Sequence, residues 1–387
     1  MKPLSSRATA LRPSPTLSLN AQLSARKEAG EEVLNLSVGE PDFPMPELAR
    51  EYALKAIGEG RNRYTDVAGV LELRERVRRK LAEDNGLHYE PGDIVVANGA
   101  KHALCNAFLA LCEEGDEVVI PAPYWVTYPE QVRLTGAAPV VVPAGEGLKL
   151  TAAQLSAAVT PRTKAVVLNS PGNPTGATYT LAELEALAEV VLRHDLFVVE
   201  DLIYEYFHYG EGAVPSIAAL GPELQDRTIV VNGVSKSCAM TGWRVGYTAA
   251  PAGIAGLIRR VQGQSTSNVS VVAQYAAIGA MNDVPWAAIG SYRARRDVAH
   301  QRLSAISGVR CELPTGAFYL FPDISAVLGE RQSTSDEFCA RLLAGTGVGL
   351  VPGTGFGAPG HVRLSYAVAT PMLETALDRL AEFIGTR

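Results

Sequence analysis

The sequence predicts an α/β fold whose centre is a mostly parallel sheet of seven strands. Seven short runs rich in β-branched residues follow one another between residues 93 and 249, and helical patterns separate them. The runs are apolar almost throughout, as in strands that are covered on both faces. Strands that alternate with helices favour parallel pairing through right-handed crossovers. The predicted strands are residues 93–97, 117–120, 138–142, 164–169, 196–200, 228–232 and 244–249.

The segments between these runs have the pattern of amphipathic helices. The clearest is Leu181–Arg193, in which apolar residues recur three or four positions apart. This spacing gives a helix one apolar stripe, which packs against a sheet. The stripe consists of Leu181, Leu184, Leu187, Ala188 and Val191.

The two ends of the chain predict a second, smaller α+β unit. A short helix and a Pro-rich loop at 39–46 occupy the first 45 residues, and a long helix follows Asn282. Extended runs and two further helices complete the chain. These runs are residues 309–312, 317–321, 347–351 and 361–365. We therefore expect a large domain of residues 46–282 and a smaller domain of residues 1–45 plus 283–387.

Composition excludes several classes of protein. Lys and Arg total 35 against 41 for Asp and Glu, a balance that disfavours a nucleic-acid binder. The densest basic stretch, Arg293 with Arg295 and Arg296, is interpreted as the solvated face of a long helix. No apolar run approaches the roughly 18 residues of a membrane span. The five cysteines form no C-x-x-C pair, which disfavours disulfides and metal sites, and no signal-peptide pattern is present, so we expect a cytoplasmic protein.

Unusual polar and glycine-rich segments follow five of the predicted strands. Ligands of open α/β sheets bind at the carboxyl ends of the strands, so these segments are expected to meet in one cavity. They are N-G-A-K at 98–101, P-A-P-Y-W at 121–125, S-P-G-N-P-T-G at 170–176, Asp201, and S-K at 235–236.

Lys236 is the candidate nucleophile of this cavity. Burial lowers the pKa of a lysine and frees its amine, so Lys236 could form a Schiff base. Arg244 could donate two parallel hydrogen bonds to a phosphate. A helix begins within residues 98–101, and the N–H groups of its first turn attract an anion. The alternatives are an ordinary surface lysine and a plain strand-to-helix connection.

Other residues of these segments suit an aromatic, electron-withdrawing ligand. Asp201 could face a pyridinium nitrogen, with Tyr204 near a ring hydroxyl. Trp125 could stack on the ring, and Asn173 could donate to a ring oxygen. The alternative roles are a cap or turn for Asp201, core packing for Trp125 and turn formation for Asn173.

Taken in order, these motifs resemble the class I aminotransferases. These enzymes have the aspartate aminotransferase fold and use pyridoxal 5′-phosphate (PLP), and the similarity is greatest to the bacterial aspartate and aspartate/prephenate aminotransferases. Each motif alone is weakly specific, but their order and spacing match over nearly the whole chain. They are G-E-P-D at 39–42, N-P-T-G at 173–176, Asp201 with Tyr204, S-K-x-x-x-M-T-G-W-R at 235–244 and V-R-L-S-Y at 362–366.

The resemblance implies a fold type I PLP enzyme and a role for each residue. Lys236 would carry PLP and move the proton, Asp201 would pair with the ring nitrogen, and Tyr204 would contact the ring oxygen. Arg363 would bind the substrate α-carboxylate. Further cofactor contacts are implied for Ala100, Lys101, Trp125, Asn173, Ser235 and Arg244. Further substrate contacts are implied for Gly39, Trp125, Asn173, Lys101 and Thr16.

The resemblance also implies a homodimer with shared sites, because Tyr64 matches a tyrosine that reaches the phosphate of the partner subunit. Three positions depart from related sequences or distinguish among them. Leu202 replaces a glutamate of many relatives, and Gly233 replaces a serine that binds phosphate in some branches. Lys101 matches a lysine that reads the distal carboxylate in some members, and Ser14 could join Thr16 beside it.

The predicted reaction is a ping-pong transfer of an amino group between aspartate or glutamate and 2-oxoglutarate or oxaloacetate. Alternatives on the same fold are an aromatic or prephenate aminotransferase and a PLP-dependent lyase. A regulator with an aminotransferase-like domain is a third class. Such regulators carry an added helix-turn-helix domain, and only about 45 residues precede the large domain here.

Overall fold

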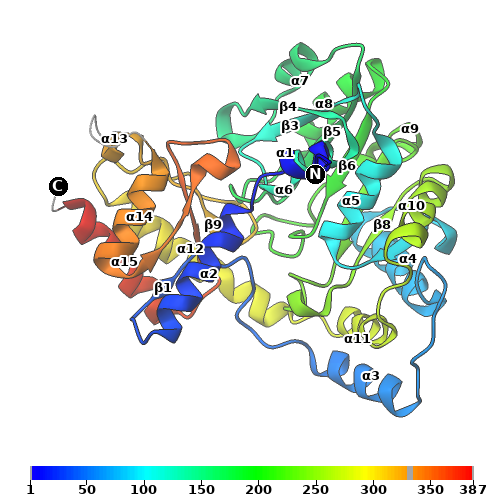
Figure 1. Ribbon diagram of the computed structural model, residues 1–387, viewed down its shortest axis with the longest axis horizontal. Coiled ribbons are helices and arrows are strands. Elements are labelled where there is room, and N and C mark those ends of the chain that lie inside the picture. The colour runs from blue at the N-terminus through cyan, green and yellow to red at the C-terminus, as the bar shows by residue number, and fades with distance from the viewer. Residues whose placement is uncertain (1, 329–333, 386–387) are drawn as a thin grey trace.

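A sheet of seven strands forms the centre of the computed structural model, which describes residues 2–328 and 334–385 (Figure 1). The strand order is β2-β8-β7-β6-β5-β3-β4. Only β8 runs antiparallel to its neighbours, so the predicted mostly parallel sheet is confirmed. The strands are β2 (Ile94–Ala97), β3 (Glu117–Ala122), β4 (Ala138–Pro143), β5 (Thr163–Asn169), β6 (Phe197–Asp201), β7 (Thr228–Gly233) and β8 (Gly246–Ala249).

Helices cover both faces of this sheet. Along β5, Ala165 and Val167 pack in one apolar cluster with α5, α6 and α10, whereas Val166 and Leu168 pack in another with α7 and α8. Helix α8 has the predicted bounds. The helices around the sheet are α3 (Glu47–Gly58), α4 (Leu71–Asn85), α5 (Ala100–Leu111), α6 (Thr127–Thr135), α7 (Ala152–Ala158), α8 (Leu181–Arg193), α9 (Pro222–Gln225), α10 (Ala252–Ser265) and α11 (Val271–Asn282).

Strand β4 departs from the prediction that the runs are covered on both faces. It is the last strand of the sheet and pairs only with β3. Its residues are exposed or half-buried, and Val141 is 41% exposed. The apolar pattern of a β-branched run therefore predicted the strand correctly but not its edge position, because position depends on strand order.

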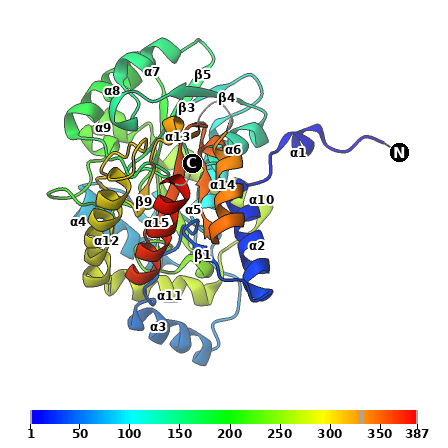
Figure 2. The same ribbon diagram turned by 90° about the vertical axis from the view of Figure 1, so that its left-hand side faces the viewer.

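Segments from the two ends of the chain lie side by side and share a separate apolar core (Figures 1 and 2). The parallel pair of β1 and β10 joins the ends directly. Residues 309–312 form no strand and make only one bridge, from Arg310 to Asp323. The elements are α1 (Ser6–Ala10), α2 (Pro15–Glu28), β1 (Leu34–Asn35), α12 (Trp286–Ser304), β9 (Tyr319–Leu320), α13 (Ser325–Leu328), α14 (Ser335–Thr346), β10 (Val348–Gly349), β11 (Val351–Pro352), β12 (Val362–Ser365) and α15 (Thr370–Gly385).

The division into two domains at about residues 45 and 282 remains a prediction, and residues 1, 329–333 and 386–387 of the smaller one lie outside the described residues. No helix among the described residues is long and apolar enough to cross a membrane.

Of the three arginines predicted to form a solvated face of α12, Arg293 is exposed, but Arg295 and Arg296 are only partly exposed. The side chain of Arg295 is 19% exposed and pairs with Asp42, in the loop that precedes α3. Arg296 is 11% exposed, and its guanidinium donates to the carbonyl of Pro314. These side chains therefore tie α12 to other segments, which their spacing along one helix could not reveal.

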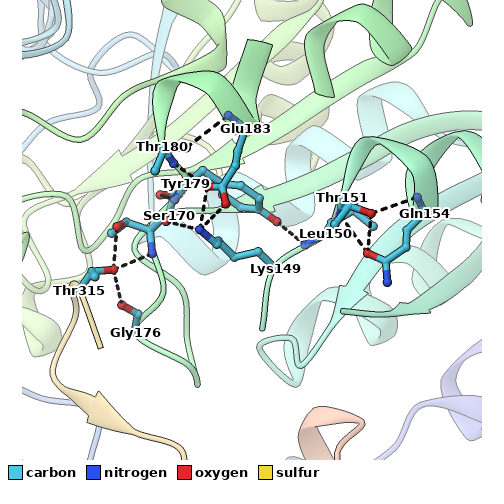
Figure 3. A network of polar contacts seen from close by, with 11 residues as sticks. Lys149, Leu150, Thr151, Gln154, Ser170, Gly176, Tyr179, Thr180, Glu183 and Thr315 are labelled. Atoms are coloured by element: carbon cyan, nitrogen blue, oxygen red, sulfur yellow. Dashed lines mark hydrogen bonds and ion pairs between the residues drawn. The ribbon is translucent and has the colours of Figure 1, made fainter. Parts of the chain in front are cut away.

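A polar network holds the loop after β5 in place (Figure 3). Ser170 accepts a hydrogen bond of 3.2 Å from the backbone N–H of Tyr179, which closes the loop on itself. Thr315 contacts the same loop from the C-terminal part of the chain, since it accepts a hydrogen bond from the N–H of Thr178 at 3.0 Å. Lys149 donates to the carbonyl of Thr178 at 3.3 Å. The loop that carries Asn173 is thus fixed from two sides.

Candidate active site

A cavity of about 310 Å³ lies at the carboxyl ends of the central strands. The loops after β2, β3, β5, β6 and β7 meet there, as predicted, and residues from α2, β9 and β12 close it from the other side. Twelve of the predicted site residues line this cavity. They are Thr16, Gly39, Ala100, Lys101, Trp125, Asn173, Asp201, Tyr204, Ser235, Lys236, Arg244 and Arg363.

Lys236 reaches into the cavity from the segment that joins β7 to β8. Its ammonium donates a hydrogen bond of 2.6 Å to the carbonyl of Gly39. The pKa of Lys236 is lowered to about 8, mainly by burial and in part by the nearby guanidinium groups of Arg244 and Arg363. Glu40 acts in the opposite direction and raises this pKa. About a tenth of the amine is therefore neutral, and hence nucleophilic, at pH 7, far more than for an unperturbed lysine.

Asp201 lies at the end of β6 and is 2% exposed. Its Oδ2 accepts a hydrogen bond of 2.8 Å from the hydroxyl of Tyr128, and its Oδ1 accepts one of 3.1 Å from the N–H of Ile203. Burial raises the pKa of Asp201 to about 6, although the bonds from Tyr128 and Ile203 work against this shift. A carboxylate with a raised pKa that faces a cavity suits a cationic ring nitrogen.

Arg363 is a buried cation that lines the cavity. Its side chain comes from β12, is 3% exposed and donates to Asn173 Oδ1 at 2.9 Å and to the carbonyl of Ser37 at 2.8 Å. Its Nε is buried and has no hydrogen-bond partner among the described residues. A buried donor without an acceptor costs free energy, so the site favours an anionic ligand that accepts from it.

Two tyrosines also line the cavity. The hydroxyls of Tyr204 and Tyr319 lie 2.9 Å apart, and both rings are buried. The guanidinium of Arg363 lies over the Tyr319 ring, 4.5 Å from its centroid. Gly39 passes close to the same side chain, because a Cβ there would lie 2.7 Å from the Tyr319 hydroxyl. This contact explains why a glycine is needed at the mouth of the cavity.

The turn before α5 and Arg244 form a cradle for an anion. The first N–H groups of α5, at Ala100 and Lys101, have no acceptor within the helix. Gly99 has a φ of 82°, and a Cβ there would lie 2.3 Å from Nη2 of Arg244. Only glycine therefore allows the guanidinium to approach this helix N-terminus.

The glycine at position 233, which departs from the serine of some related sequences, has a similar explanation. A Cβ on Gly233 would lie 2.7 Å from the carbonyl of Val245 and 2.8 Å from the Cα of Gly246. Strands β7 and β8 approach too closely here for any side chain. The close approach of the two strands therefore accounts for the glycine.

Lys101 and Trp125 lie together at one end of the cavity. The ammonium of Lys101 is 5.1 Å from the centroid of the Trp125 ring. Burial and the charge of Arg244 lower the pKa of Lys101. Ser14 and Thr16, whose hydroxyls lie 2.9 Å apart, line the cavity as well.

Tyr64 is the one predicted site residue that lies outside the cavity. Its side chain is 91% exposed, so it takes no part in the site of its own chain. The predicted contact with a partner subunit remains a prediction.

Sequence reasoning missed several residues of the cavity. Tyr128 and Asn169 are the most informative, because both bond Asp201: Tyr128 through its hydroxyl and Asn169 from its amide to the Asp201 carbonyl at 2.9 Å. Asn169 also accepts from the N–H of Asn173 at 2.9 Å. Both missed residues stand next to recognised motifs, three residues after Trp125 and one before S-P-G-N. The others are Asn20, Ser37, Val38, Glu40, Ile203, Thr241 and Tyr319.

Known proteins are similar to this chain in sequence and in structure. The model of the family "Aminotransferase class I and II" matches residues 31–380. The aspartate aminotransferase of Geobacillus stearothermophilus is 48% identical, with 99% of each chain covered. A probable aspartate/prephenate aminotransferase of Aquifex aeolicus is 42% identical, with 98% of each chain covered. The solved structure of the Thermus thermophilus aspartate aminotransferase with maleate superposes with a TM-score of 0.92 at 40% identity, covering 99% of this chain and 100% of that one.

Proposed function

The chain belongs to the class I and II aminotransferases, and from that premise we propose that it transfers an amino group between aspartate or glutamate and a 2-oxo acid. The observation that carries this proposal is the pair of cations, Arg363 and Lys101, that line one cavity. Arg363 has an unpartnered Nε and suits an α-carboxylate. Lys101 suits a second carboxylate, so the cavity favours dicarboxylic substrates.

We propose PLP as the cofactor, because the groups of the cavity fit its parts. The cradle of Gly99, α5 and Arg244 fits the phosphate, and the buried Asp201 carboxylate fits the ring nitrogen. Trp125 can cover the ring, Tyr204 and Asn173 can donate to its oxygen, and Ser235, which also lines the cavity, can donate to the phosphate. Lys236 would form the covalent link. When bound, PLP supplies an electron sink for the bonds broken at the substrate Cα.

In this proposal the protein contributes proton transfer, orientation and exclusion of water. Lys236, with its lowered pKa, would take the proton from the substrate Cα and deliver it to the cofactor, and would carry out the reverse transfer in the second half-reaction. Arg363 fixes the α-carboxylate and thereby the direction of the Cα–H bond. The segment with Gly39, which already contacts Lys236, covers the reacting atoms from solvent.

The names of the relatives support the substrate class. The Geobacillus protein is an aspartate aminotransferase, and the Thermus protein was solved with maleate, a dicarboxylate. The Aquifex protein is named for aspartate and prephenate. Prephenate, a 2-oxo acid that carries a second carboxylate, is therefore our second candidate acceptor.

We further propose that the protein acts as a homodimer with shared sites, in the two-domain arrangement predicted from the sequence. The exposed Tyr64 ring supports this, and so does the N-terminal segment with α1, which is exposed and projects from the body of the molecule beside α6 (Figure 2). All five cysteines are free thiols, which supports a reducing compartment such as the cytoplasm.

One assay tests the proposed reaction. Purified enzyme with PLP is incubated with aspartate and 2-oxoglutarate, and glutamate is quantified against the aspartate consumed. A transaminase gives one glutamate for each aspartate, whereas a lyase on this fold consumes aspartate without forming glutamate. The same assay with prephenate and with aromatic donors ranks the acceptors and donors. Absence of glutamate would refute the proposal.

A further inference from the structure

A buried ion pair lies near the cavity but does not line it. Lys80 of α4 and Glu205, next to Tyr204, form it with side chains that are 4% and 8% exposed. Burying two charges is costly, and apolar side chains of similar size often stabilise a protein as well or better. A contribution to stability therefore does not by itself account for the Lys80–Glu205 pair. The hydrogen bonds of Glu205 indicate a second role.

The Glu205 carboxylate joins three segments of the chain. It accepts a hydrogen bond of 2.6 Å from the amide of Asn232 in β7 and one of 2.7 Å from the amide of Asn85 at the end of α4. Lys80 pairs with the same carboxylate and donates to Asn85 Oδ1 at 2.6 Å. Because both oxygens of Glu205 are engaged, its orientation is fixed.

The contact with Asn232 extends the link between β6 and β7 beyond their ladder. The paired register ends at Asp201 and Val231, and the last backbone bond runs from Leu202 N–H to the Val231 carbonyl at 2.9 Å. The chain then turns, with Glu205 N–H bonded to the Leu202 carbonyl at 2.9 Å. The Glu205 side chain returns to β7 one residue further on, at Asn232.

The two segments that Glu205 and Asn232 join both carry residues of the proposed active site. Asp201 and Tyr204 precede Glu205, and Lys236 follows Asn232 by four residues. Asn232 uses its remaining amide oxygen to accept from Gly233 N–H at 2.7 Å, so the chain leading to Lys236 is held as well. We propose that Glu205, through its bond with Asn232, is a positioning residue that sets the separation between Lys236 and the Asp201–Tyr204 pair. This inference rests on the proposed function, in which all three residues contact one cofactor.

The test distinguishes the effect of the hydrogen bond between Glu205 and Asn232 from the effect of the two charges of the Lys80–Glu205 pair. Asn232→Val cuts the link but leaves Glu205 paired with Lys80 and Asn85. The double variant Lys80→Met/Glu205→Gln removes both charges but keeps an acceptor for Asn232. Glu117→Gln is the matched control. Glu117 is a buried carboxylate with side-chain donors from Thr160 and Arg162, and it lies at the opposite, amino end of β3.

Three quantities are measured for each PLP-loaded protein: the thermal unfolding midpoint, the pH midpoint of the visible cofactor absorbance without substrate, and kcat and KM for aspartate. We expect Asn232→Val to shift the absorbance midpoint by about half a pH unit or more and to lower kcat by about tenfold or more. KM should change by less than about threefold. The double variant and Glu117→Gln should keep the parent absorbance midpoint.

An unchanged absorbance midpoint and kcat in Asn232→Val would overturn the inference. Activity losses that follow thermal stability alone across the variants would do the same, because they indicate a packing role. If Asn232→Val is not recovered folded, Lys80→Met/Glu205→Met cuts the same link from the other side and is judged by the same criteria. A parent protein without a visible cofactor band would instead refute the proposed function, and a parent that binds PLP but ignores aspartate would refute only its substrate.

Discussion

The hydroxyl of Tyr128 donates a hydrogen bond of 2.8 Å to Oδ2 of Asp201, across 73 residues of sequence. Both groups are almost completely buried. Burial raises the pKa of Asp201 to about 6, and the Tyr128 bond keeps it from rising further. The state of the carboxylate that would face the cofactor nitrogen therefore depends on a residue outside the recognised motifs.

Removing this bond should move the acid limb of the pH profile. Tyr128→Phe takes one donor from a buried carboxylate, a loss of about 1.5–3 kcal/mol, or roughly one to two pKa units. The pKa of Asp201 rises, so kcat/KM should begin to fall at a higher pH on the acid side. The alkaline limb should stay in place. Tyr124→Phe, a tyrosine that does not line the cavity, is the control; identical acid limbs for Tyr128→Phe and the parent would contradict this prediction.

The pKa of Lys236 predicts how PLP attaches to the cofactor-free protein. Only the neutral amine attacks an aldehyde, and with a pKa of about 8 its fraction rises roughly tenfold from pH 7 to pH 9 and then levels off. An unperturbed lysine would give a rise of about a hundredfold without levelling. The rate is followed by the absorbance change on mixing. Glu40→Gln removes a charge that raises this pKa, so its midpoint should lie at lower pH; a midpoint at or above that of the parent would count against the assignment.

Lys101 should discriminate between acidic and neutral substrates. Lys101→Ala removes a charge-assisted contact worth about 2–4 kcal/mol in a closed site. kcat/KM for aspartate and glutamate should fall by about 30-fold or more, whereas a neutral donor such as phenylalanine should be affected much less. Arg363→Lys is the comparison, because it weakens the α-carboxylate contact shared by all donors. Equal losses for every donor in Lys101→Ala would remove Lys101 from the specificity determinants.

The shared-site dimer predicts complementation. Tyr64→Phe and Lys236→Ala are each expected to be defective, and Lys236→Ala should be inactive. When the two proteins are mixed, dissociated and re-associated, a hybrid contains one site with both residues intact. Activity should then recover to a fraction of the parent value. A fully active parent monomer in sedimentation experiments would contradict the shared site.

The raised pKa of Glu200 predicts that the free energy of unfolding depends on pH. Burial raises its pKa to about 7, although Ser216 and the N–H of Ile217 donate to it. Because the folded pKa exceeds the unfolded value of 4.5, the folded state binds the proton more tightly. The resulting stability is complete below about pH 4.5 and is lost as the pH rises through about 7, a change of about 3 kcal/mol.

Glu200→Gln should lack this loss. The free energy of unfolding, measured by denaturant titration between pH 4.5 and 8, should therefore favour the variant increasingly over the parent as the pH rises. Glu117→Gln provides the opposite control, since hydrogen bonds from Thr160 and Arg162 lower the pKa of Glu117. Parallel pH profiles for Glu200→Gln and the parent would exclude the predicted linkage.

The sequence by itself determined the seven strands, the helix Leu181–Arg193 and twelve of the residues that line the cavity at the strand ends. These features depend on local pattern: apolar runs, helical spacing, and motifs that stand directly after strands. The same local reasoning failed for residues 309–312, which were predicted to be extended but form only a single bridge. It also failed for β4, because the order of strands decides which of them lies at the edge.

Only the tertiary structure decided which distant groups meet. The Tyr128–Asp201 bond, the Lys80–Glu205 pair and the contact of Arg295 with Asp42 join residues that lie 73 to 253 positions apart. No spacing along one element encodes such contacts, because they depend on how the strands are ordered and how both ends of the chain pack against the sheet. The tertiary structure also explains Gly233 as a close approach of two strands. The local sequence pattern thus specified the motifs that form the site. Tertiary packing specified the pKa values of their side chains and the distances between them.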